Sequence, residues 1–215
     1  MNATAPRQNS RRLMVAVGLV LLAIAAAALY LITDEPRNAQ NAGGGETTGA
    51  TLPSELATGQ MAALVIHKSP QDIPDFTFTD ADGKEQSLAK WRGKTVLVNL
   101  WATWCAPCRE EMPGLAELQR NYGGDDFEVV AISLDQKGAP AAQAFLDEIK
   151  ISNLALYLDP TTKSLRSLKS VGLPTTILVN PQGKEVARLM GTALWDSPDA
   201  VRVIETAIGR ADPKV

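Results

Sequence analysis

The sequence predicts an α/β fold, with helices on both faces of a central mixed sheet, preceded by an N-terminal transmembrane helix. Three observations predict it. Strand-like apolar runs alternate with segments of helical periodicity in the order βαβαβαββα, which is typical of a sheet covered by helices. A turn at 181–183 joins two of these strands as a hairpin. A run without charged residues, 13–32, lies near the N-terminus.

The uncharged run at 13–32 is long enough to cross a membrane. About 20 helical residues span roughly 30 Å, which is the thickness of the hydrocarbon core. A cleaved signal peptide is the alternative, but its apolar core is usually about 7–15 residues long. Charged residues of opposite sign flank the run: Arg7, Arg11, Arg12, Asp34 and Glu35. The positive-inside rule then places residues 1–12 in the cytoplasm and the domain outside, which is the periplasm in a Gram-negative bacterium.

Residues 33–60 have the composition of a flexible linker, because they are rich in Gly, Asn and Thr and show no apolar periodicity. The folded domain is expected over residues 61–215. Its strands are predicted from alternating or continuous apolar runs: 76–79, 95–101, 127–134, 154–158, 175–179 and 185–190. The runs at 95–101 and 127–134 are almost continuously apolar and rich in β-branched residues, so both should be buried strands.

Helices are predicted between these strands from apolar residues at helical spacing: 108–122, 139–150, 162–170 and 197–208. In the first helix Met112, Leu115 and Tyr122 share one face, and Gly123-Gly124 ends it. Pro198 stands in the first turn of the last helix, where a backbone N–H has no helical partner.

Composition and cysteine count narrow the possible functions. A net charge of −3 gives no support for nucleic-acid binding. The two cysteines, Cys105 and Cys108, cannot form the several bridges of a disulfide-rich scaffold. A structural disulfide between them would close too short a loop to constrain much chain entropy. A zinc site would need further ligands, and the single histidine, His67, is distant in sequence. A copper(I) site made of the two thiolates stays open as an alternative, because soft thiolates suit that ion.

The position of the cysteine pair favours thiol–disulfide exchange. The predicted strand ends at Trp101, and a helix begins at or near Cys105, whose thiol pKa should fall because a helix N-terminus stabilises an anion. Cys105 should therefore be the exposed nucleophile, and Cys108, one turn later, the more buried resolving thiol. Cys105 would attack a substrate disulfide, and Cys108 would then release the reduced substrate and leave a Cys105–Cys108 disulfide.

Glu111 is the candidate proton acceptor for Cys108. It lies at i+3 from Cys108, on the same helical face, and burial would raise its pKa toward neutrality. An exposed helical carboxylate is the alternative, and the adjacent Glu110 fits that description better. Trp101 is expected in the core and Trp104 at the surface beside Cys105. His67 is expected to be a surface residue without a role.

The stretch Trp104-Cys-Ala-Pro-Cys108, between a strand and a helix, and Val171-Gly-Leu-Pro-Thr175 both resemble the thioredoxin-like proteins. The resemblance implies a thioredoxin-like fold and a cis peptide bond before Pro174, which would face the cysteines. It also leaves the backbone of Leu173 free to pair with an extended substrate segment. The residues expected to contact substrate are Trp104, Ala106, Pro107, Leu173 and Thr175. No cofactor beyond the redox-active disulfide is expected.

Residues 97–113 resemble more narrowly the TlpA-like branch, whose members are membrane-anchored and extracytoplasmic. This resemblance supports Glu111 and implies reductive work on partner proteins with disulfides, either apocytochromes c or assembly proteins of the copper centre in cytochrome oxidase. Electrons would come from a membrane-embedded thiol carrier. The motif alone leaves a disulfide-donating oxidase open, because reduction potentials in the family span a wide range.

Two positions depart from related patterns. Thioredoxin has a buried Asp where this chain has Asn99, and an amide cannot accept the proton, so that role would pass to Glu111 or to a water. Peroxiredoxins share the fold and carry a Thr three residues before the reactive Cys. Position 102 is Ala here, which argues against peroxide reduction.

Overall fold

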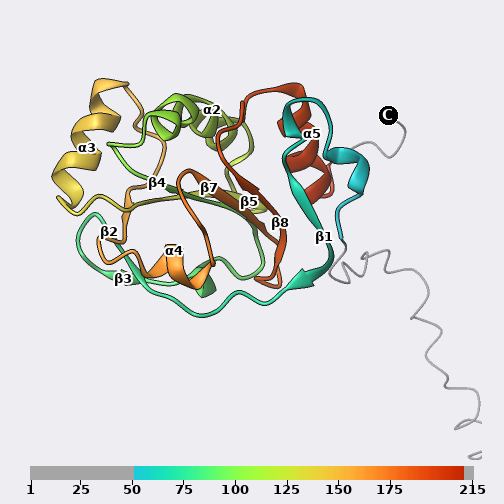
Figure 1. Ribbon diagram of the computed structural model, residues 1–215, viewed down its shortest axis with the longest axis horizontal. Helices are drawn as coiled ribbons and strands as arrows, with labels where there is room; N and C mark the ends of the chain where they lie inside the picture. The colour runs from blue at the N-terminus through green and yellow to red at the C-terminus, as the bar shows by residue number, and fades with distance from the viewer. Residues whose placement is uncertain (1–50, 211–215) are drawn as a thin grey trace, which may run out of the picture. The chain divides into compact units, whose positions relative to one another are not determined.

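A mixed sheet forms the centre of the domain in the computed structural model, which describes residues 51–210. Within that range the sheet has eight strands in the order β1-β8-β7-β4-β5-β6-β2-β3 (Figure 1). The strands are β1 (Val65–Gln71), β2 (Phe78–Asp80), β3 (Glu85–Gln86), β4 (Thr95–Trp101), β5 (Phe127–Ser133), β6 (Tyr157–Leu158), β7 (Thr175–Val179) and β8 (Glu185–Met190). The central strand β4 pairs in parallel with β5 and antiparallel with β7, and all its residues are buried.

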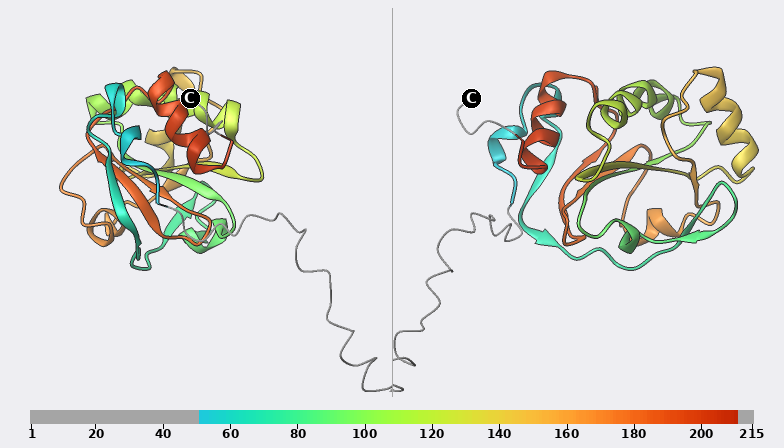
Figure 2. Two further views of the ribbon diagram at one scale, coloured as in Figure 1. Left: turned by 90° about the vertical axis from the view of Figure 1, so that its right-hand side faces the viewer. Right: turned by 180° about the vertical axis from the view of Figure 1, so that it is seen from behind.

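Helices lie on both faces of this sheet (Figure 2). One face carries α2 (Ala106–Tyr122), α3 (Ala139–Glu148) and α5 (Pro198–Ala207), and the other carries α4 (Lys163–Ser167) and the 3-10 turn η3 (Leu88–Trp91). The two faces have separate cores. Leu97 and Trp101 of β4 pack with the residues of α2, whereas the alternate residue Val98 packs in the core that contains Trp91. The α/β architecture with a central mixed sheet is therefore confirmed.

The predicted elements agree with the structure where the apolar pattern is strong. Strands 95–101, 175–179 and 185–190 are confirmed at their predicted bounds, and the four helices lie within about two to three residues of theirs. The strand predicted at 154–158 is reduced to the two residues of β6. β1 and β3 were not predicted. Every residue of β1 is exposed or half-buried, and β3 consists of only two polar residues, so neither shows an apolar pattern.

The folded domain begins earlier than predicted. Residues 51–60 were expected to be the end of a flexible linker, but they form the 3-10 turns η1 (Ser54–Leu56) and η2 (Gly59–Met61), which contact α5. Leu52 and Met61 are buried, and the backbone N–H of Gln60 donates to Asp199 Oδ2 at 2.9 Å. Turns of three residues have no periodicity to detect, so sequence patterning missed them.

The predicted cytoplasmic segment 1–12, the transmembrane helix 13–32 and most of the linker lie outside the described residues. Between residues 51 and 210, no helix combines the length and the apolar character that a membrane span requires.

Candidate active site

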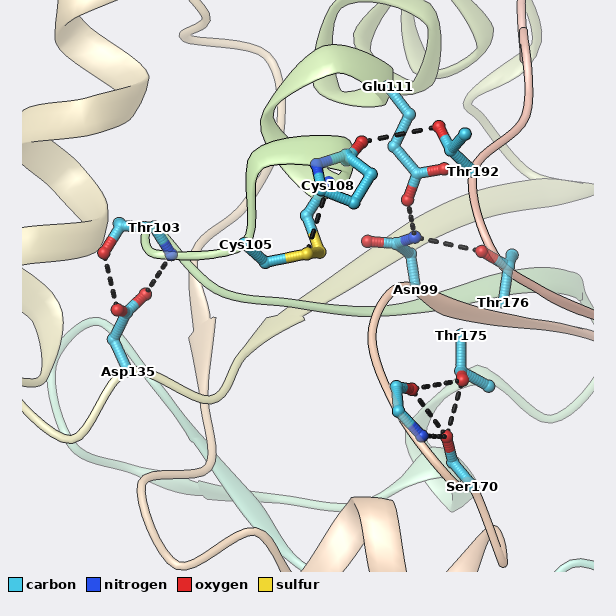
Figure 3. Close-up of a disulfide and its surroundings, with 12 residues drawn as sticks. Asn99, Thr103, Cys105, Cys108, Glu111, Asp135, Ser170, Thr175, Thr176 and Thr192 are labelled. Atoms are coloured by element: carbon cyan, nitrogen blue, oxygen red, sulfur yellow. Dashed lines mark hydrogen bonds between the residues drawn. A yellow bond between two sulfur atoms is a disulfide. The ribbon is translucent and has the colours of Figure 1, made fainter.

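The two cysteines form a disulfide at the N-terminus of α2, with their Cα atoms 5.3 Å apart (Figure 3). Cys105 is the N-cap residue of the helix, and its Sγ accepts a hydrogen bond from the backbone N–H of Cys108 at 3.3 Å. A thiolate on Cys105 would therefore face the helix N-terminus, which favours negative charge. This placement agrees with the role predicted for Cys105.

The two sulfurs differ in accessibility less than expected. Cys108 is fully buried, as predicted, but Cys105 is only 6% exposed, so the expectation of an exposed sulfur was too strong for this oxidised state. Cys105 belongs to the same core as Trp101 and Ala102, and Leu173 packs against that core. Of the two cysteine residues, Cys105 is thus the more accessible.

The loop between β4 and α2 is held by Asp135, which follows β5. The backbone N–H of Thr103 donates to Asp135 Oδ2 at 2.9 Å and its hydroxyl to Oδ1 at 2.6 Å. The Ser133 hydroxyl also donates to Asp135 Oδ2, at 2.8 Å. These contacts join the ends of two parallel neighbouring strands, and the sequence analysis did not identify them. The signal available was polar residues directly after a buried strand.

The surface beside the disulfide comes from the residues that follow this loop. Trp104 is 70% exposed, and Ala106 and Pro107 are also exposed, whereas Trp101 is fully buried. The structure therefore confirms the expected positions of both tryptophans. Trp104, Ala106 and Pro107 are all accessible to a partner molecule.

Glu111 lies one turn after Cys108 and is enclosed between α2 and the sheet, with an exposed fraction of 2%. Its Oε1 accepts a hydrogen bond from Asn99 Nδ2 at 2.7 Å. Its Oε2 accepts from the indole Nε1 of Trp195 at 3.1 Å and from the backbone N–H of Ala193 at 3.3 Å. Burial raises the pKa of Glu111 from 4.5 to about 7, although the three hydrogen bonds oppose the shift. The predicted burial of Glu111 is confirmed, and its pKa is shifted in the predicted direction.

The segment 191–197 completes this network, and sequence reasoning missed it. Trp195 is buried, and Gly114 of α2 allows the segment to approach closely, because a Cβ there would lie 3.2 Å from the backbone nitrogen of Trp195. The Thr192 hydroxyl donates to the carbonyl of Pro107 at 3.4 Å. These contacts join residues more than 80 positions apart, which no local pattern reveals.

Asn99 connects Glu111 to the neighbouring strand β7. It is fully buried on β4, and its Nδ2 also donates to the Thr176 hydroxyl at 2.9 Å. Asn99 Oδ1 is buried without a hydrogen-bond partner among the described residues. Asn99 was predicted only as a departure from thioredoxin, and Thr176 was not singled out.

The loop before β7 carries the predicted cis peptide bond, between Leu173 and Pro174. Thr175, however, does not line a groove with its side chain, as had been expected. It is 1% exposed, and its hydroxyl bonds to the carbonyl of Gly172 at 2.7 Å and to the Ser170 hydroxyl at 2.5 Å. Its side chain faces inward because it closes the loop on itself. Leu173 is half-buried and remains available for substrate contact.

His67 is not the free surface residue that was expected. It lies on β1, and its Nε2 is 2.7 Å from Oε1 of the buried Glu185 on β8. Arg188 binds the same carboxylate with two nitrogens, at 2.6 and 2.7 Å. Burial opposes ionisation, but the hydrogen bonds from Arg188 and His67 hold the pKa of Glu185 below its ordinary value. This cluster attaches the edge strand β1 to the sheet.

The described part of the chain offers little to a metal ion. Between residues 51 and 210 no group of three or more His, Cys, Asp or Glu side chains has the arrangement of a metal site. Cys105 and Cys108, once reduced, would supply two sulfur ligands.

Comparisons with known proteins agree with this geometry. The model of the AhpC/TSA family matches residues 70–187. The chain is 34% identical over 121 residues to the thiol-disulfide oxidoreductase ResA of Bacillus subtilis, a match that covers 56% of this chain and 66% of ResA. It is 33% identical to ResA of Geobacillus thermodenitrificans over 146 residues, which cover 67% of this chain and 79% of that protein.

Solved structures of thiol:disulfide interchange proteins also resemble this chain. A protein assigned as the thiol:disulfide interchange protein DsbE of Chlorobium tepidum superposes with a TM-score of 0.59 and 28% identity, over 65% of this chain and 97% of that one. A thiol:disulfide interchange protein of a Bacteroides species gives a TM-score of 0.56 and 31% identity, over 67% of this chain and 92% of that one.

The raised pKa of Glu111 makes a prediction about stability. The folded protein holds this proton up to about pH 7 and the unfolded chain only to about pH 4.5, so the free energy of unfolding should fall as pH rises through this window. The loss should be about 3 kcal/mol between pH 4 and pH 8. Glu111→Gln should remove this part of the pH dependence, measured by chemical denaturation of the oxidised protein. Glu110→Gln, at the exposed neighbouring position, is the matched control and should keep it. Equal pH dependence in the Glu111 variant and the wild type would contradict the prediction.

Proposed function

Because the chain belongs to the AhpC/TSA family and is a thioredoxin-like thiol–disulfide oxidoreductase, we propose that it reduces disulfides in partner proteins outside the cytoplasm. The observation that carries the proposal is the position of Glu111, a buried carboxyl with a pKa of about 7, one helical turn after the fully buried Cys108. A buried thiol can react only after it loses its proton, and a group with this pKa can accept a proton at neutral pH.

The proposed reaction begins with the dithiol form. The Cys105 thiolate attacks one sulfur of a substrate disulfide, and the other substrate sulfur leaves as a thiolate that takes up a proton. Cys108 then gives its proton to Glu111, and its thiolate attacks Cys105 Sγ in the mixed disulfide. The second substrate sulfur leaves as a thiolate and takes up a proton, which balances the one that Glu111 accepted and then releases. The substrate has gained two electrons, and the chain is left with the Cys105–Cys108 disulfide.

The substrate is proposed to dock across the two segments beside the disulfide. Trp104, Ala106 and Pro107 offer exposed surface on the helix side, and the half-buried Leu173 borders the loop of the cis proline. An extended segment that carries the target cysteine could pair with the backbone at Leu173, as edge-binding peptides do. Thr175 is left out of this proposal because its side chain is buried.

The proposed partners are apocytochromes c or assembly proteins of the copper centre in cytochrome oxidase. In both cases thiols must be reduced before a haem or a metal is inserted. The support is the resemblance of residues 97–113 to an extracytoplasmic branch that does this work. The proposed reductant is a membrane thiol carrier, since the chain has no second cysteine pair to pass electrons along.

The proposed location is the bacterial inner membrane, with a single span at 13–32 and the domain in the periplasm. The full chain should stay with membranes washed in alkaline carbonate, and a chain lacking residues 1–32 should be released. Recovery of a mature protein whose N-terminus lies after the apolar run would replace the anchor with a cleaved signal peptide.

The two cysteines should fail in different ways. Cys105→Ser should lose insulin reduction by at least about 100-fold, because no nucleophile remains for the first attack. Cys108→Ser should still attack but should accumulate a mixed disulfide, visible as an adduct on a non-reducing gel. Cys105→Ser is the matched control, since it should form no adduct. Insulin reduction at the wild-type rate in both variants would overturn the proposed function.

The direction of the reaction can be tested by redox titration of the folded domain against glutathione or dithiothreitol. For a reductase we expect a potential closer to the value of thioredoxin, about −270 mV, than to that of the oxidant DsbA, about −120 mV. A potential near the DsbA end would instead assign the chain to disulfide donation.

A further inference from the structure

The two polar atoms of the Asn99 side-chain amide differ in their hydrogen bonding: Nδ2 has partners and Oδ1 has none among the described residues. Nδ2 donates to both Glu111 Oε1 and Thr176 Oγ1, so it has used its two hydrogens. Oδ1 accepts from no described residue, although the side chain is fully buried. Figure 3 shows this oxygen turned away from Glu111 and Thr176, on the side of the cysteine pair. A buried carbonyl oxygen without a hydrogen-bond donor costs free energy, so a state that supplies a donor to it is favoured.

The carboxyl of Glu111, in contrast, is surrounded by hydrogen-bond donors and has no acceptor among its described partners. Its three described partners are the Asn99 amide, the backbone N–H of Ala193 and the indole of Trp195, and all three donate. This arrangement suits an ionised carboxylate, which only accepts hydrogen bonds. A neutral carboxyl must also donate its proton, and none of these three groups can accept it.

Rotation of the Asn99 amide by 180° removes both mismatches. Oδ1 would then stand beside Glu111 Oε1 and Thr176 Oγ1, where it can accept the proton of a neutral Glu111. The Thr176 hydroxyl can donate as well as accept, so its bond to Asn99 would be kept with reversed direction. Nδ2 would take the present place of Oδ1 and point to the side of the cysteine pair.

We propose that Asn99 is a positioning residue whose amide turns between two orientations and so matches the protonation of Glu111 to that of Cys108. With Glu111 ionised, Oδ1 faces the cysteine side and can accept the S–H of a reduced Cys108. With Glu111 neutral, Nδ2 faces that side and can donate to a Cys108 thiolate. The first orientation therefore suits the state before proton transfer, with the proton on Cys108 Sγ. The second suits the state after it, with the proton on the Glu111 carboxyl. The inference rests on the proposed function for its role in turnover, but not for the rotation itself.

The groups around Glu111 make this coupling specific. On its own helix the neighbour is Cys108. The 191–197 segment contributes Ala193 and Trp195, β4 contributes Asn99, and β7 acts through Thr176. The hydrogen bonds described for Glu111 all come from uncharged donors, and none of the ion pairs within residues 51–210 includes it. A change in the protonation of Glu111 therefore acts directly on the Asn99 side-chain amide, whose oxygen and nitrogen can exchange places by rotation.

The rotation can be observed directly by NMR in the oxidised full domain, where the cysteines do not titrate. At pH 9 the Asn99 amide protons should show NOEs to the Thr176 methyl group. At pH 5 these should weaken, and NOEs to the Cys108 β protons should appear, with the same midpoint as the ¹³C-carboxyl shift of Glu111. An identical NOE pattern at both pH values would mean a fixed amide and would overturn the proposal. The NOEs involve no turnover, so a fixed amide would leave the proposed reductase standing, and an inactive enzyme would leave the rotation standing.

Glu111→Gln is the matched control for this experiment, because its side chain keeps the shape of Glu111 but has no charge to lose. The Asn99 NOE pattern should become independent of pH in this variant. A pattern that still changes with pH would show that another group drives the amide, which would also overturn the proposal.

A double-mutant cycle tests the coupling to Cys108. In the reduced protein, Asn99→Leu should raise the pKa of Cys108 by about one unit, read from the pH dependence of its alkylation, because the thiolate loses a buried donor. The same substitution in the Glu111→Gln background should have a clearly larger effect, because the Gln amide can donate to Asn99 Oδ1, as a neutral Glu111 does, and so holds Nδ2 toward Cys108 at every pH. An equal shift in both backgrounds would show that Asn99 acts without Glu111 and would contradict the proposal.

Discussion

A carboxyl group that is enclosed between a helix and a sheet, with only uncharged hydrogen-bond donors around it, is the feature on which the proposed chemistry of this domain depends. Glu111 cannot ionise as easily as in water, because the surrounding core does not solvate its charge, and its pKa rises to about 7. It can therefore exchange a proton near neutral pH. In the proposed exchange the fully buried Cys108 must lose a proton, and Glu111 stands one turn from it.

The rest of the fold serves to keep that carboxyl in place. The central strand β4 presents Asn99 to it, and the register of β4 against β7 pairs Asn99 with Thr176. Segment 191–197 covers it from the other side, with Trp195 fitted against Gly114 of α2. Three donors from two separate parts of the chain thus converge on one side chain of α2. This convergence requires the sheet and the helix to be formed, so the environment of Glu111 depends on the tertiary structure.

The sequence was most informative where a pattern is local. The apolar runs of β4, β7 and β8 and the Cys-x-x-Cys spacing were enough to predict the sheet centre, the helix after it and the place of the disulfide. Glu111 could be identified because i+3 on a helix is also a local relation. Trp195 and Thr176 could not be, since each meets the site across more than 75 positions of sequence. The inward side chain of Thr175 and the early start of the fold near Leu52 also depend on packing that no periodicity records.

The place where the described chain enters the fold has a geometric consequence. Thr51 and Leu52 line the same cavity as Thr95, the first residue of β4, whereas Cys105 follows the last residue of that strand, Trp101. A strand of seven residues is about 20 Å long, so Thr51 and Leu52 lie at one end of the domain and the disulfide lies at the other. Any restraint on the chain before Thr51 would therefore act at the end of the domain that is remote from the two sulfurs.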